Sequence, residues 1–337
     1  MKKGAAVFLS VLLLIAAYFA YSWLRDNKLP NFYGNAELYV TEDDGPEEVV
    51  EALSSQLTIL SERRLRAVFR QKHVAEFIQP GHYRVDGSRS SVYVARMLNN
   101  GWQTPVRLTL AGSLRTKGEI ARKIAAPLRA DSASVRAAMD DAGLLSRYGV
   151  NPDTVFEAFF PATYDIWWTA SFSDVLERCR RASDAFWTDE RTARAAALGL
   201  SRHDAVTLAS IVKGESNYRP ELRKIAGVYL NRLRKGMLLQ ADPTVAFCFG
   251  YKPRRILYRH LEVDSPYNTY RHAGLPPGPI CVPDDYYIEA VLDPDFGGGN
   301  LFFCASSNMD GTHVFAKTAE EHGKNARAFQ AALNNRK

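Results

Sequence analysis

The distribution of apolar residues separates one long hydrophobic stretch near the start from the mixed sequence that follows. Residues 4–24 contain no charged side chain, and their length matches the ~20 apolar residues that a membrane-spanning helix requires. Tyr18, Tyr21 and Trp23 lie toward the far end of the stretch, as in the aromatic belt at a membrane–water interface. This pattern predicts a single transmembrane helix.

The charges on either side of the stretch predict its orientation. Lys2 and Lys3 precede it and favour a cytoplasmic N-terminus, whereas Arg25 and Lys28 on the far side weaken the asymmetry. We therefore expect one pass through the inner (plasma) membrane and an extracytoplasmic, periplasmic remainder. A cleaved signal peptide is the alternative, because residues 16–20 include small side chains, although the apolar core is long for a signal peptide.

Beyond this stretch, alternating and amphipathic segments follow one another without regular order, which predicts an α+β fold and not a doubly wound sheet. The expected regions are a cytoplasmic end at 1–3, the transmembrane helix at 4–24, a linker at 25–35, a small mixed domain at 36–113 and a larger domain at 114–337. Strands are expected at 38–40, 83–85 and 106–110. Helical segments are expected near 50–53, 61–70, 90–98, 116–145, 173–188, 201–215, 221–233 and 319–333, with a late hairpin that joins 301–303 to 313–315.

The helix expected at 201–215 ends in an unusual residue. Ser201 and Asp204 match a helix N-cap and its partner three positions later. The apolar face that follows is formed by Ala205, Leu208 and Val212. Glu215 is the next position on this face, where loss of hydration would raise the pKa of a carboxyl toward that of a general acid. The alternative is a helix that ends beside Gly214 and leaves Glu215 in solvent.

Hydrogen-bonding side chains are concentrated after this helix. They occur in the helix at 221–233, in the segments 239–244 and 265–270, and before a stiff Pro/Gly loop at 274–279. Each has a structural explanation alone, such as a cap or a turn. Together they predict a carbohydrate groove, because aromatic faces stack on sugars while amides bond their hydroxyls. The candidate substrate-binding residues are Asn231, Gln240, Asp242, Thr244, Tyr267 and Asn268.

Composition and charge narrow the classes of partner. A net charge of +6 and a pI near 9.0 suit an anionic partner such as a bacterial wall or membrane headgroups. Nucleic acid is not expected as a partner, because the basic residues are scattered and the anchor separates the chain from DNA. The four cysteines form no Cys-x-x-Cys pair and the seven histidines no His-Glu-x-x-His, so we expect neither a metal nor another cofactor. One disulfide and buried free thiols remain open alternatives.

Several segments resemble the signature blocks of the MltG (YceG-like) family of endolytic murein transglycosylases. The order and spacing of the blocks match as well as their content, and a weaker block at 81–84 resembles the LysM-like membrane-proximal domain of that family. The matching blocks are 208–215, 228–233, 236–237, 239–244, 267–270 and 274–280.

The resemblance implies a single-pass inner-membrane lyase that cuts nascent peptidoglycan strands internally. The bond cut would be the one between N-acetylmuramic acid and N-acetylglucosamine, leaving 1,6-anhydromuramic ends and terminating strand elongation. The family's catalytic glutamate falls on Glu215. Members often carry another acidic residue where this chain has Lys213 and a larger residue where it has Gly214. The implied partners are glycan strands, the membrane, and peptidoglycan synthases or division proteins.

A single carboxyl suffices for this chemistry, because an internal hydroxyl of the sugar replaces the attacking water. Two other functions stay open. A hydrolytic muramidase would use Asp242 or Asp165 to position water opposite Glu215. A catalytically silent wall-binding or division scaffold would need no acid. A helix-turn-helix at 201–218 fits the pattern alone, but the anchor argues against it.

Overall fold

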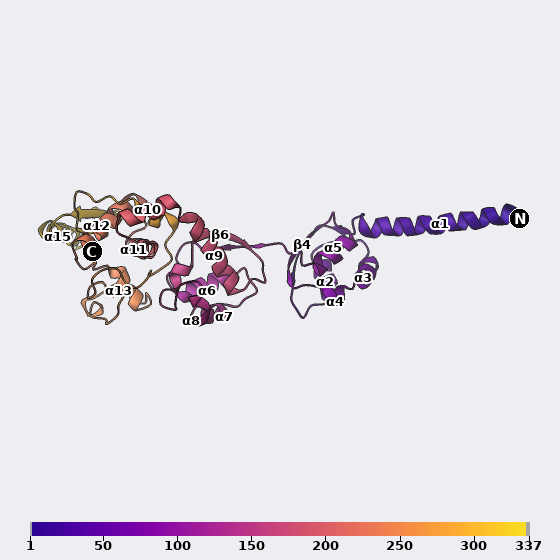
Figure 1. The fold of residues 1–337 in the computed structure, drawn as a ribbon, viewed down its shortest axis with the longest axis horizontal. Coiled ribbons are helices and arrows are strands. Elements are labelled where there is room, and N and C mark those ends of the chain that lie inside the picture. Colours follow the sequence, from indigo (N-terminus) through magenta and orange to yellow (C-terminus); the bar gives the residue numbers. More distant parts are fainter. Residues whose placement is uncertain (1, 335–337) are drawn as a thin grey trace. The chain divides into compact units, whose positions relative to one another are not determined.

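The computed structural model describes the backbone of residues 2–334 and the side chains of residues 6–334. It divides into two compact units (Figure 1). The first comprises Met1–Arg107, Pro127–Arg129 and Asp165–Ala170, and the second comprises Leu108–Ala126, Ala130–Tyr164 and Ser171–Lys337. The fold is therefore mixed α+β, as the sequence predicts, and each unit is described separately.

The apolar stretch forms one continuous helix, α1 (Lys2–Asn27). Residues Ala6–Asn27 are long and apolar enough to cross a membrane, and none of this span is buried in the protein. The helix extends three residues beyond the predicted end at residue 24, and near its end the Arg25 guanidinium donates to Asp26 and Ser22. Length and composition thus fit the predicted anchor.

The first unit is built around an antiparallel strand pair, β2 (Asn35–Val40) and β4 (Gly81–Asp86), in which Leu38 lies opposite Tyr83. Alternate residues of β2 are buried, which explains why its period-two pattern predicts a strand. The predicted helices are present as α2 (Pro46–Ser54), α3 (Glu62–Gln71) and α5 (Ser91–Asn99). The unpredicted elements are β1 (Phe32–Tyr33), β3 (Thr58–Ile59) and α4 (Val74–Phe77), all too short to leave a periodic signal. The LysM-like assignment of this region stays a prediction.

The second unit begins with a strand pair and several short helices. Strand β5 (Val106–Thr109) pairs with β6 (Thr163–Ile166), and both strands belong partly to each unit. The helix-rich segment predicted at 116–145 resolves into α6 (Lys117–Ala125), α7 (Ser132–Ala138) and α8 (Ala142–Ser146). The short helix η1 (Val155–Ala158), the predicted long helix α9 (Phe172–Phe186) and the unpredicted α10 (Asp189–Ala197) follow.

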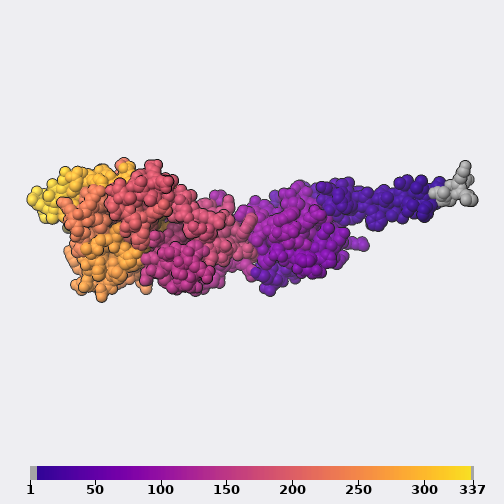
Figure 2. Space-filling model, in the orientation of Figure 1, coloured from indigo at the N-terminus to yellow at the C-terminus, as the bar shows by residue number. Residues whose placement is uncertain are grey.

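Helix α11 (Arg202–Glu215) is the central element of this unit (Figure 1). Its predicted capping box is present, since the Asp204 carboxylate accepts hydrogen bonds from the Ser201 N–H and hydroxyl. The residues predicted to be buried on its apolar face are fully buried: Ala205, Leu208 and Val212. Neighbouring elements are η2 (Arg219–Glu221), α12 (Leu222–Arg234), α13 (Asp242–Cys248), η3 (Tyr258–His260) and α14 (Asp285–Leu292). Segments from distant parts of this unit's sequence meet on one surface (Figure 2).

Helix α13 replaces a segment that the sequence pattern treats as a loop. Pro243 lies at the second helical position, where its missing N–H has no intrahelical acceptor to lose. The polar residues around it therefore start a helix instead of a turn. The predicted late hairpin is present as β7 (Phe302–Ala305) and β8 (His313–Ala316), followed by α15 (Ala319–Asn334). All four cysteines have free thiols.

Candidate active site

Glu215 is the last residue of α11, and the chain turns sharply after it. Ser216 has an extended backbone, with φ −150° and ψ 146°, and its N–H donates to the Val212 carbonyl. The buried Tyr287 hydroxyl donates to the Ser216 carbonyl at 3.2 Å. These two bonds hold both backbone polar groups of Ser216, the residue that follows Glu215, so the position of the carboxyl is set by the helix end and not by a free loop.

The two residues before Glu215 are structural. A Cβ atom on Gly214 would lie 2.5 Å from Cβ of Pro243, so glycine permits the close approach of α11 and α13. Lys213 is buried and its Nζ donates to the Asp284 carboxylate at 2.7 Å, and also to the carbonyls of Gly112 and Val282. The two positions where this chain departs from the family pattern thus have structural roles: Gly214 permits close helix packing, and Lys213 forms an internal ion pair.

The Glu215 carboxyl has a neutral hydrogen-bond partner. The Tyr229 hydroxyl donates to Oε1 at 2.5 Å, and its own ring is buried edge-to-face against Phe303. Burial raises the pKa of Glu215 to about 7, with a smaller increase from the Asp242 charge, while the Tyr229 bond and Arg232 partly oppose the rise. A large fraction of the carboxyl is therefore protonated at neutral pH, as a general acid requires.

Glu215 is shared by two adjacent cavities. The first has a volume of about 250 Å³ and is lined by Glu215, Tyr229, Arg232, Leu239, Gln240, Asp242, Tyr270, Phe303 and His322. The second has about 480 Å³ and is lined by residues 215–218, 305–306, 309, 311–313 and 329. Glu215 therefore borders both cavities, of which the first is the more polar.

Arg232 joins the first cavity to the surrounding backbone. Its side chain is largely buried and donates to the carbonyls of Leu239 at 2.7 Å and Leu301 at 2.6 Å. The next residue of this loop, Gln240, has φ +52°, a left-handed conformation that non-glycine residues seldom adopt. Its N–H donates to the Thr269 carbonyl at 3.1 Å. These bonds fix a strained backbone beside the acid, and leave the exposed Gln240 side chain at the cavity.

Asp242 and His322 supply two further polar groups. The Tyr270 hydroxyl donates to the Asp242 carboxylate at 2.6 Å. Burial lowers the pKa of His322, so the imidazole is held toward its neutral form. Within residues 2–334, Nδ1 of this imidazole has no hydrogen-bond partner, although the ring is stacked on Phe302. A ligand hydroxyl would satisfy this buried nitrogen.

Comparison with known proteins identifies the family of this chain. A model of the YceG-like family matches residues 38–328. The chain belongs to the YceG-like family. A relative in Bacillus subtilis (strain 168), named endolytic murein transglycosylase, is 30% identical over 304 residues, which cover 85% of this chain and 82% of the relative.

Two further comparisons extend this finding. A protein of the same name in Streptococcus pneumoniae serotype 2 (strain D39 / NCTC 7466) is 25% identical over 362 residues, which cover 96% of this chain but 64% of that longer relative. A crystal structure of a yceG-like protein from Listeria monocytogenes covers 86% of this chain and 98% of its own, with a TM-score of 0.56 and 27% identity.

The YceG-like structure brings two of the six predicted substrate-binding residues to Glu215, namely Gln240 and Asp242. The other four hold loops and helices together. Asn231 donates to the carbonyls of Phe296 and Asn300, and the fully buried Asn268 donates to those of Leu261 and Val263. Thr244 bonds Ala241 and Thr269, while the Tyr267 hydroxyl donates to the Asp153 carbonyl. Their polar groups are thus already bonded inside the protein.

Sequence reasoning missed four polar side chains that line the first cavity: Tyr229, Arg232, Tyr270 and His322. Tyr229 lies on the apolar face of its helix, so the pattern indicates a core residue. Arg232 offered a signal, because a charged residue at the third position after Tyr229 interrupts that face. His322 is more than 100 residues from Glu215 in sequence, and no local pattern connects them.

Proposed function

We propose that this protein is an endolytic murein transglycosylase, a lyase that cuts peptidoglycan glycan strands internally with Glu215 as its acid. The observation that carries this proposal is a carboxyl with a pKa raised to about 7 at the junction of two cavities. The names of the relatives in B. subtilis and S. pneumoniae support the same activity.

The first chemical step is protonation of the leaving oxygen. Because Oε1 of Glu215 accepts the Tyr229 hydroxyl, we assign the transferable proton to Oε2. Donation of this proton to the glycosidic oxygen accompanies cleavage of the bond between that oxygen and C1 of the muramoyl residue. Glu215 is then a carboxylate, which Tyr229 and the nearby Arg232 stabilise.

The second step returns the proton. The Glu215 carboxylate takes a proton from the C6 hydroxyl of the same muramoyl residue while that oxygen bonds to C1. The product carries a 1,6-anhydro end, and the acid is restored without water. Because the attacking hydroxyl belongs to the substrate, the ring closure has a large effective concentration and needs no second carboxylate as nucleophile.

Cutting inside a strand requires room for sugars on both sides of the broken bond. The two cavities that share Glu215 supply this room. We assign Gln240, Asp242 and His322 to sugar hydroxyls on one side. Thr312 and Asn217 line the other. Asn231, Thr244, Tyr267 and Asn268 are proposed to act indirectly, by holding the loops that carry these groups.

The placement of α1 supports action at the outer face of a membrane. Its span has the length and composition of a membrane-crossing helix, and we infer an uncleaved, single-pass anchor. Lys2 and Lys3 favour a cytoplasmic N-terminus, which leaves the second unit in the periplasm with nascent glycan strands as its substrate. Peptidoglycan synthases or division proteins are the protein partners expected at that site.

A hydrolytic muramidase is the second candidate, because Asp242 also lines the cavity of Glu215 and could position a water. Asp165, the other acid considered, is exposed on β6 and does not line the cavities of Glu215. The measurement that separates the reactions is mass spectrometry of products from uncrosslinked glycan strands, cut by the full chain in lipid nanodiscs.

Internal fragments one water lighter than hydrolysis products are expected, and Glu215→Gln should abolish them. Full-mass reducing ends would instead show a hydrolase. Cleavage that survives in Glu215→Gln would remove this residue from the mechanism, and a folded wild-type chain that cuts no strand would favour the scaffold.

A further inference from the structure

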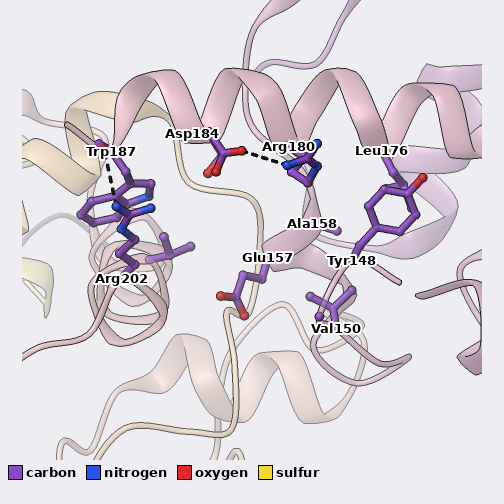
Figure 3. Close-up of a pocket in the computed structure, with 12 residues that line it drawn as sticks. Tyr148, Val150, Glu157, Ala158, Leu176, Arg180, Asp184, Trp187 and Arg202 are labelled. Carbon is purple, nitrogen blue, oxygen red and sulfur yellow. Dashed lines mark hydrogen bonds and ion pairs between the residues drawn. The ribbon is translucent and has the colours of Figure 1, made fainter. Parts of the chain in front are cut away.

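A third cavity in the second unit lies near the opposite end of α11 from Glu215. It has a volume of about 210 Å³ and lies between α9, the start of α11 and the segment 148–158 (Figure 3). Its lining residues are Tyr148, Gly149, Val150, Glu157, Ala158, Leu176, Arg180, Ser183, Asp184, Trp187, Arg202 and Val206. The cavity is smaller than the ~300–1,000 Å³ of typical small-molecule sites, so it suits one side chain of a larger ligand.

The cavity combines apolar and charged walls. Leu176 and Val150 are buried, and Ala158 and Val206 are half-buried. Charged groups of both signs border the same space, and the Glu157 carboxylate points into the gap that Asp184 and Arg202 border (Figure 3). Such a surface complements a ligand with a methylene chain between an amine and a carboxylate.

The charged groups differ in how completely they are already paired. Arg180 contacts the carboxylates of Glu177 at 2.9 Å and Asp184 at 3.2 Å. Arg202 forms no ion pair with an acidic side chain in the part of the chain that the structure describes. Its guanidinium lies 5.7 Å from the Trp187 ring centroid, and its Nη2 donates to the Thr192 hydroxyl at 3.0 Å and to the Trp187 carbonyl at 3.4 Å. One guanidinium is therefore available for an anion.

The acidic side of the cavity is held in place. The Glu157 carboxylate bonds Nδ1 of His203 at 2.6 Å through Oε2, which leaves Oε1 for a ligand donor. The Trp187 ring is buried and covered by Arg202, so it offers no open face on which a sugar could stack. Charge recognition is thus favoured over sugar recognition.

We propose that this cavity binds the diamino-acid residue of a stem peptide, with its carboxylate at Arg202, its methylene chain on the apolar wall and its amine at Glu157 and Asp184. The proposal rests on the proposed function, because such peptides are substituents of peptidoglycan strands. Arg202 and Glu215 are the first and last residues of α11, about 20 Å apart at 1.5 Å per residue. The bound peptide therefore belongs to a neighbouring unit of the strand and not to the sugar being cut.

A binding experiment tests this site without requiring catalysis. Full-length Glu215→Gln protein in nanodiscs is titrated by calorimetry with alanyl-γ-glutamyl-lysine and with the analogue that carries norleucine in place of lysine. We expect the lysine peptide to bind about tenfold more tightly, a difference of about 1.4 kcal/mol. Equal affinity for the two peptides, or no binding of either, would overturn the proposal.

Two variants locate the peptide. Arg202→Gln should weaken binding of the lysine peptide about tenfold, and Glu157→Gln, which keeps the shape of the side chain, should remove the preference over norleucine. The matched control is Arg181→Gln, since Arg181 lies on the same helix as Arg180 but outside the cavity. Unchanged binding by both cavity variants, or an equal loss with Arg181→Gln, would place the peptide elsewhere.

Cleavage assays then separate this proposal from the activity itself. In the chain with native Glu215, Arg202→Gln should raise KM several-fold for strands that carry stem peptides and leave KM unchanged for strands stripped of them. Equal effects on both substrates would mean that the substitution perturbs the fold and that no peptide is read at this site. A wild-type chain that cuts neither substrate but still binds the tripeptide would contradict the proposed reaction but not the peptide site.

Discussion

The two ends of α11 hold acidic side chains in opposite environments. Asp204, in the first turn, is half-buried and accepts two hydrogen bonds from Ser201, and its negative charge is favoured by the helix dipole. Glu215, at the last position, borders two cavities, and burial of its carboxyl raises its pKa to about 7. The dipole at this end also disfavours a negative charge. The same functional group therefore stabilises the helix at one end and stores a transferable proton at the other.

The largest expected effect comes from removing the proton at the C-terminal end. Glu215→Gln should lower cleavage by at least roughly 10²–10⁴-fold, because glutamine cannot donate a proton to the glycosidic oxygen. Its side-chain carbonyl can still accept the Tyr229 hydroxyl, so thermal unfolding should show no loss of stability. Measurement of kcat and of the unfolding midpoint on one preparation checks both statements. A comparable loss of activity in Asp204→Asn would break the contrast between the two ends.

The pH dependence should carry the same signature. Protonated Glu215 is the active form, so cleavage should fall as pH rises through about 7, the pKa to which burial raises this carboxyl. Because the folded state holds this proton more tightly than the unfolded chain, stability contributed by Glu215 should be present below its ordinary pKa and decline as pH rises toward about 7. The stability trend should be absent from Glu215→Gln, so it should appear in the difference between wild type and this variant. If the activity of the wild type already fell near pH 5, this would contradict the assignment of Glu215 as the acid.

Removing the Tyr229 hydroxyl, the hydrogen-bond partner of Glu215, should change the pH dependence of cleavage. The hydrogen bond from Tyr229 to Oε1 favours the charged form of Glu215. Tyr229→Phe deletes this bond, so the pKa of Glu215 and with it the alkaline limit of kcat should move upward. The value of kcat should fall by about tenfold, or about 1.4 kcal/mol. The pH–rate profile is the measurement. Tyr267→Phe is the matched control, because its hydroxyl bonds the Asp153 carbonyl and not the acid. It should lose some stability without shifting the profile.

The features that could be predicted from sequence are those with a local cause. The capping box and apolar stripe of α11 identify both its start and the unusual place of Glu215. Helix α13 escaped prediction because Pro243 and its polar neighbours favour a turn until packing against Gly214 selects a helix. The acid's partners also escaped. A buried tyrosine such as Tyr229 leaves the same pattern whether it packs or donates a proton, and His322 reaches the cavity only through tertiary folding.

The polar residues predicted to bind substrate also show what sequence alone cannot decide. Asn268 and Gln240 have the composition of a sugar site, yet the structure uses the first to bond backbone carbonyls and exposes the second at the cavity. Loops need internal donors as much as ligands do. Residue type alone therefore cannot separate the two uses, and burial decides between them.

The smallest expected effect lies at the N-terminal end of α11. Asp204→Ala removes the acceptor of the Ser201 N–H and hydroxyl, and loss of such a cap typically costs about 1 kcal/mol of stability. The decrease should appear in chemical unfolding as a lower midpoint with an unchanged slope. The pH–rate profile and kcat should stay at their wild-type values, because Glu215 and Tyr229 keep their positions at the far end of the helix. A shifted profile would mean that the charge of Asp204 reaches the acid through the helix, and the two ends would then form one electrostatic unit.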